Sequence, residues 1–125
     1  MEAIRRYPFD TALVALNAAD RARLSFIEQV LPVAAERGVG VIGMKVVARG
    51  SLLKPGGVLT VREALGYVWS LPVSTAIVGF QRVEEVDEAV ELARQVAPFS
   101  AEEMARLEAL ARSSAEAVSW FKRSA

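Results

Sequence analysis

The 125-residue sequence contains neither cysteine nor histidine. Without cysteine it cannot form disulfide bonds or thiolate metal sites, and without histidine it lacks the side chain that most often transfers protons at neutral pH. Fifteen basic and fifteen acidic residues balance, so no net positive charge attracts nucleic acid or anionic membranes. No apolar run approaches the roughly 20 residues of a membrane-spanning helix. We therefore expect no nucleic-acid partner, no membrane association and no metal site.

The composition is that of a soluble globular chain, with 53% hydrophobic and 24% charged residues. No apolar core of signal-peptide length follows Met1, and we expect a cytoplasmic protein. No linker or low-complexity segment divides the sequence, which predicts one domain over residues 1–125. At 125 residues the chain is about the size of one ordinary domain.

Three short apolar segments have the pattern of strands buried on both faces of a parallel sheet. They are residues 11–16, 39–44 and 73–78. Segments with helical periodicity follow them, at residues 24–37, 61–70, 83–96 and from 101 onward. This alternation predicts an α/β fold in which helical crossovers connect parallel strands.

Local signals refine the helix boundaries. Pro32 should kink or divide the helix over residues 24–37. Thr60 with Glu63, and Ser100 with Glu103, have the spacing of capping boxes that open the next helices. We expect the tail over residues 115–125 to continue as a frayed helix.

The sequence resembles the aldo/keto reductase family in four segments that occur in the family's order. They are residues 9–17, 38–45, 72–79 and 98–103. The first three are similar to the sixth, seventh and eighth strands of that family's barrel, and the fourth is similar to the entry of its late helix. The resemblance implies a partial (β/α)₈ TIM barrel of three parallel βα units plus a C-terminal helix.

The chemistry that this resemblance implies is hydride transfer between a nicotinamide cofactor, NADP or NAD, and a small carbonyl or alcohol. The family's Asp-Tyr-Lys-His tetrad lies on the first few strands, so the resemblance places none of it in this chain. Tyr67 is interpreted as a packing residue, and Asp20 has no visible partner in the sequence. We therefore expect no catalytic residue here and a chain that is inactive alone.

Cofactor contacts are expected at the C-terminal ends of the strands, where barrels bind their ligands. The resemblance places Asn17 beside the nicotinamide and Met44 where many members stack an aromatic ring on it. Lys45 follows at the rim and would face the pyrophosphate. Leu13 stands where many members use a glutamine on the carboxamide.

The turn after the third strand resembles the family's site for the adenosine phosphate. It consists of Gly79, Phe80, Gln81 and Arg82, and it leads into a helix whose positive end suits an anion. Glu88 corresponds to the acidic residue on the adenine amine. Glu85 stands at a position that is usually basic in the family, and its negative charge would repel a 2′-phosphate. The positive charge of Arg82 could offset this repulsion, so the choice between NADP and NAD stays open.

Two other interpretations remain. The strand-end residues can be plain turn and rim residues, and the chain can be a non-enzymatic protein that self-associates through its open sheet edges. A doubly wound α/β domain is disfavoured, because no glycine-rich dinucleotide fingerprint follows the first strand.

Overall fold

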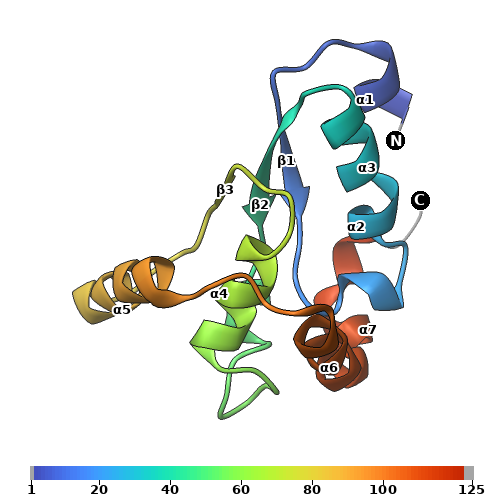
Figure 1. The fold of residues 1–125 in the computed structure, drawn as a ribbon. Helices are drawn as coiled ribbons and strands as arrows, with labels where there is room; N and C mark the ends of the chain where they lie inside the picture. The colour runs from blue at the N-terminus through green and yellow to red at the C-terminus, as the bar shows by residue number, and fades with distance from the viewer. Residues whose placement is uncertain (1, 123–125) are drawn as a thin grey trace.

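Three parallel strands form one sheet in the computed structural model, which describes residues 2–122. They are β1 (Thr11–Ala15), β2 (Gly40–Met44) and β3 (Thr75–Ala76), in the order β1-β2-β3 (Figure 1). In the register of the sheet, Thr11 lies opposite Gly40 and Ile42 lies opposite Thr75. The predicted α/β class with parallel strands is confirmed.

Helices occupy most of the remaining described chain. The α-helices are α1 (Glu2–Arg6), α2 (Phe26–Gln29), α3 (Leu31–Glu36), α4 (Val61–Trp69), α5 (Val83–Gln95), α6 (Ala101–Ala111) and α7 (Ala115–Val118). The short 3₁₀ turns are η1 (Asp20–Ala22), η2 (Ala48–Gly50), η3 (Arg112–Ser114) and η4 (Trp120–Lys122). Helix α1 is five residues long and was not predicted, because so short a segment shows no apolar periodicity. None of the helices within residues 2–122 has the length and apolar character needed to cross a membrane.

The helix predicted over residues 24–37 is divided, as Pro32 indicated. Ser25 caps α2 by accepting a hydrogen bond from the Glu28 N–H, and α3 begins at Leu31. Pro32 lies at the start of α3, where its missing N–H group has no intrahelical acceptor to lose. Gly38 ends the helix with a left-handed φ of +66°.

The two predicted capping boxes differ. In α4 the Thr60 side chain accepts from the Glu63 N–H at 3.2 Å, and the Glu63 carboxylate accepts from the Thr60 N–H at 2.9 Å. In α6 only the first half forms: Ser100 Oγ accepts from the Glu103 N–H. The Glu103 carboxylate instead binds Arg106 at 2.8 Å.

Within residues 2–122, helices pack on one face of the sheet and leave the other uncovered. Side chains alternate between the faces of a strand, and a Cβ atom on Gly43 would lie 3.1 Å from Val68 of α4. Gly43 therefore marks the packed face. Leu13 and Ile77 belong to the opposite face, and each is 53% exposed. An uncovered apolar sheet face is typical of a surface that another element or chain covers.

The third strand is shorter than predicted. Only Thr75 and Ala76 of residues 73–78 are strand. Two hydrogen bonds of 2.8 Å flank them and also connect this segment to β2. The Ser74 N–H donates to the Val41 carbonyl, and the Ile77 N–H donates to the Gly43 carbonyl. Like β1, β3 lies at an edge of the sheet, but only two of its residues pair with β2.

The predicted helical tail is confirmed over residues 115–118, but it packs against the body instead of fraying. Helix α7 and turn η4 form here, and Val118 and Lys122 are buried. The final part of that prediction, residues 123–125, lies outside the described residues. In Figure 1 the C-terminal segment returns to the neighbourhood of α2, while α5 stands apart on the far side of the sheet.

Candidate functional site

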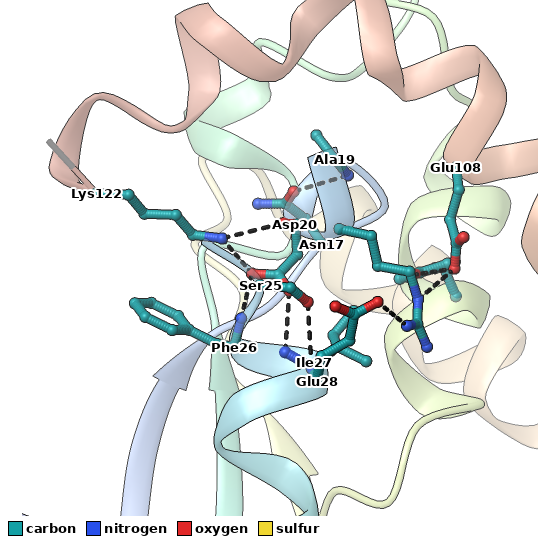
Figure 2. Close-up of polar contacts among 11 residues, drawn as sticks. Asn17, Ala19, Asp20, Ser25, Phe26, Ile27, Glu28, Glu108 and Lys122 are labelled. Atoms are coloured by element: carbon teal, nitrogen blue, oxygen red, sulfur yellow. Dashed lines mark hydrogen bonds and ion pairs between the residues drawn. The ribbon is translucent and has the colours of Figure 1, made fainter. Parts of the chain in front are cut away.

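Asn17 joins the C-terminal ends of β1 and β2. Its Nδ2 group donates to the Lys45 carbonyl at 3.2 Å. Its Oδ1 atom accepts from the Ala19 N–H at 3.0 Å, as Figure 2 shows. The residue is only 4% exposed. Both ends of this amide are therefore used within the protein, and Asn17 holds the strand ends together.

Met44 and Lys45 lie at the end of β2 and border a pocket of about 650 Å³ along the open edge of β1. Leu13, Phe26 and Phe121 also line this pocket. Lys45 has a positive φ of 56°, and its Nζ atom lies 4.1 Å from the centre of the Phe121 ring. Within residues 2–122 no carboxylate forms an ion pair with this ammonium group.

The turn before α5 already holds a negative charge. Glu85 Oε2 accepts from the Gln81 N–H at 2.8 Å, and its Oε1 atom pairs with Arg82 Nε at 3.3 Å. The Gln81 N–H bond holds the pKa of Glu85 below its ordinary value, with Arg82 acting in the same direction. The charge of Arg82 is thus shared with Glu85, and one backbone donor of the turn is already used.

The remaining predicted residues of this turn are exposed. Gly79 and Phe80 are open to solvent, as is Glu88 on α5. No hydrogen bond or ion pair in the described part of the chain links them to Asn17, Met44 or Lys45. The structure therefore groups the predicted residues into two places, one at the ends of β1 and β2 and one at the start of α5.

Asp20 has a partner that the sequence did not reveal. Lys122 Nζ forms an ion pair with Asp20 Oδ1, and their side chains are 2% and 1% exposed. The carboxylate also accepts from Ser25 Oγ at 2.7 Å and from the Ile27 N–H at 2.9 Å (Figure 2). Lys122 is 102 residues away in the sequence, so no local spacing signals this pair, and the statement that Asp20 lacks a partner is corrected.

Tyr67 is a buried packing residue, as predicted from its place on α4. Its hydroxyl donates to Glu108 Oε1 at 2.8 Å, and Arg21 Nε donates to the same oxygen at 2.9 Å. Burial, followed by the bond to the Glu108 carboxylate, raises the pKa of Tyr67. This phenol therefore connects α4 with α6 and keeps its proton.

The residues that the structure describes contain no group of three or more acidic residues that could hold a metal ion. The chemistry available at the strand ends is therefore that of ammonium, guanidinium and backbone donors, with apolar surface beside them.

Comparison with solved structures finds a similar fold in an aldo-keto reductase from Bacillus halodurans, AKR11C1, in both its holo and apo forms. Each superposes with a TM-score of 0.67 at 23% sequence identity. The chain has the fold of part of an aldo-keto reductase. The match covers 87% of this chain but only 45% and 46% of the two matched chains, so this chain spans about half their length. No protein-family model matches the sequence, and no curated protein matches it.

Proposed function

We propose that this chain is the C-terminal part of an NAD(P)H-dependent aldo/keto reductase barrel, where it supplies part of the cofactor site and none of the proton-transfer tetrad. The observation that carries the proposal is the fold likeness to part of an aldo-keto reductase, covering 87% of the chain. In such an enzyme the bound nicotinamide supplies the hydride for a small carbonyl substrate. The role of this chain is to bind and orient that cofactor. Its location is proposed to be cytoplasmic, which suits a sequence without cysteine.

The ends of β1 and β2 fit the nicotinamide and diphosphate part of such a cofactor. Lys45 presents an ammonium group that has no ion pair within the described chain, and a phosphate group suits it. Met44 offers a thioether that can pack on a flat ring. Asn17 acts through Lys45, because its amide holds the Lys45 backbone.

The start of α5 fits a ribose better than a 2′-phosphate. The Glu85 carboxylate accepts a hydrogen bond from the Gln81 N–H, so this backbone donor is not available to a 2′-phosphate. The negative charge of Glu85 would also repel the phosphate. A carboxylate can accept hydrogen bonds from ribose hydroxyls. Gly79 and Phe80 leave this turn open, and Glu88 lies one turn further along α5. The proposal therefore favours NADH over NADPH.

Calorimetric titration of the chain with NADH and NADPH tests this assignment. We expect NADH to bind more tightly, and Glu85→Gln to improve NADPH binding more than NADH binding. Glu84→Gln is the matched control, because it removes the same charge from the same helix turn. Failure of both dinucleotides to bind would contradict the proposal, and equal effects of the two variants would contradict the placement of Glu85.

The absence of the tetrad has its own test. The purified chain should reduce no small aldehyde with either dinucleotide, as measured by the loss of nicotinamide absorbance. Turnover that follows the chain through purification would contradict this part of the proposal.

A second candidate function is non-enzymatic self-association, which the uncovered sheet face favours. Leu13 and Ile77 are exposed beside the open edges of β1 and β3, and such edges favour association with another chain. Analytical ultracentrifugation tests this: a discrete oligomer that dissociates in a Leu13→Glu variant would support it. A monomer that binds NADH would contradict self-association and support the reductase proposal.

A further inference from the structure

Turn η4 is joined to the body of the protein by the hydrogen bonds of one side chain. Lys122 Nζ donates to Asp20 Oδ1, as Figure 2 shows. It also donates to the Asp20 carbonyl at 3.2 Å and to the Arg23 carbonyl at 3.0 Å, so each of the three N–H groups of the ammonium has an acceptor. Within the described chain, no other hydrogen bond joins residues 119–122 to residues 2–114. One buried cation therefore carries the polar attachment of this turn.

The acceptor side of this contact is built into the body and does not depend on the tail. The Asp20 carboxylate also accepts from Ser25 Oγ and from the N–H groups of Phe26 and Ile27. These three donors remain when Lys122 leaves, and water can then hydrate both charges. Each partner is therefore satisfied with the turn docked and with the turn released, as a contact that opens and closes requires.

The other charged contacts of η4 with the body are weaker. Lys45 Nζ lies 4.8 Å and Arg49 Cζ 5.5 Å from the centre of the Trp120 ring, and Trp120 is 51% exposed. Cation–ring contacts at exposed positions stabilise only slightly. They assist docking, but they do not replace the buried ion pair.

Docking of η4 places Phe121 in the wall of the pocket along β1. Phe121 lines this pocket together with Phe26 and Met44, and Lys45 Nζ lies 4.1 Å from the centre of the Phe121 ring. Phe121 directly precedes Lys122 in the sequence. Release of the ammonium group therefore also withdraws this ring from the pocket.

We propose that residues 119–122 form a strap that opens and closes over one end of the pocket while the sheet stays folded, with the Asp20–Lys122 ion pair as its clasp. Asp20 and Lys122 are positioning residues, because they act on the pocket through Phe121. The effect of the strap on a dinucleotide rests on the proposed function, since the pocket end that it covers is the one assigned to the nicotinamide. The closed strap adds an aromatic wall there, so NADH should favour closure.

Acetylation of the chain with acetic anhydride, followed by mass spectrometry, measures opening without any ligand. The lysines of the sequence are Lys45, Lys54 and Lys122, and the exposed Lys54 supplies the reference. We expect Lys122 to react roughly a hundredfold more slowly than Lys54, at a rate that stays constant in urea below the unfolding transition. Reaction at the rate of Lys54, or reaction that rises with urea as the sheet unfolds, would overturn the inference.

A variant of the acceptor tests the clasp itself. Asp20→Asn removes the negative charge and should bring the reaction rate of Lys122 to within about threefold of that of Lys54. Glu91→Gln is the matched control, because Glu91 pairs with Arg94 at an exposed site and should leave Lys122 protected. Protection of Lys122 that persists in folded Asp20→Asn would refute the clasp.

Hydrogen exchange of the unmodified chain decides the question if Asp20→Asn does not fold. The amides of Ser119 and Lys122 should exchange faster than that of Leu16, which bonds to the Met44 carbonyl at 2.9 Å, and with little dependence on urea. Exchange of all three amides in step with urea would show that the tail opens only when the whole chain unfolds, which contradicts the strap.

Calorimetry with NADH separates this inference from the proposed function. Lys122→Met should bind NADH roughly three- to tenfold more weakly than the unmodified chain, because less of it is closed, whereas Lys54→Met should bind NADH unchanged. Equal affinities would refute the link between the strap and the cofactor. If the unmodified chain binds no NADH, the proposed function and this link are refuted, while acetylation of Lys122 still decides whether the strap opens.

Discussion

Replacing Lys122 with methionine removes the cation of the buried ion pair and keeps a side chain of similar length. The carboxylate of Asp20 then remains buried, with hydrogen bonds from Ser25 Oγ and the N–H groups of Phe26 and Ile27. Breaking a buried ion pair from one side costs roughly 3–5 kcal/mol. Because three donors still serve Asp20, we expect Lys122→Met to lose about 3 kcal/mol, the low end of that range.

Asp20→Ala should cost more, about 4–5 kcal/mol, because it also removes the bonds to Ser25, Phe26 and Ile27 and leaves the Lys122 ammonium buried. The double variant should cost less than the sum of the two single variants, since the partners interact directly.

Urea unfolding followed by circular dichroism measures these losses. Arg94→Met is the matched control, because Arg94 pairs with Glu91 at an exposed site and should cost at most about 0.5 kcal/mol. If Lys122→Met unfolds at the same urea concentration as the unmodified chain, the tail is not docked as described, and the reasoning about η4 fails.

Three further predictions concern local packing and capping. Gly57→Ala should destabilise the chain by roughly 1–3 kcal/mol, because a Cβ atom there would overlap the loop backbone, while Gly56→Ala, with open space around it, should change stability little; thermal melts distinguish them. Thr60→Ala should cost about 1 kcal/mol in urea unfolding through loss of the α4 cap, and an unchanged midpoint would contradict the capping box. Burial raises the pKa of Glu63, but its bonds to Arg106 and Thr60 outweigh burial and lower it below 4.5. The ionised Glu63 carboxylate therefore stabilises the fold fully above pH 4.5, and this contribution is lost as the pH falls through the lowered pKa. Glu63→Gln should flatten the acid side of a plot of unfolding free energy against pH.

Local patterns predicted most of the framework. Strands β1 and β2 were found because continuous apolar runs are typical of parallel strands, although the expected burial of both faces was wrong, since Leu13 on one face is 53% exposed. The division at Pro32 follows from a missing N–H group. The extent of β3 was overestimated, because an apolar run shows where a strand lies but not how many of its residues pair with the neighbouring strand. Likewise, Glu103 has the spacing for a capping box, but its carboxylate binds Arg106 instead. Sequence spacing alone does not show which of these two interactions forms.

The packing of the tail against the body was not predicted, and the reason is physical. Lys122 looks like an ordinary solvated charge in the sequence, and only the folded chain brings it to Asp20. The cation–ring contacts of Lys45 and Arg49 with Trp120 depend on the same docking. Long-range contacts of this kind leave no periodic signal in a single sequence, so the packing of the tail beside the strand ends could not be predicted.

The claim that these strand ends bind a nicotinamide dinucleotide is tested most directly by two-dimensional ¹H–¹⁵N NMR of the chain titrated with NADH. The account predicts the largest shifts at the amides of Lys45, Gly79 and Gln81, with small shifts along α6. A spectrum unchanged at saturating NADH, or shifts confined to α6, would contradict it.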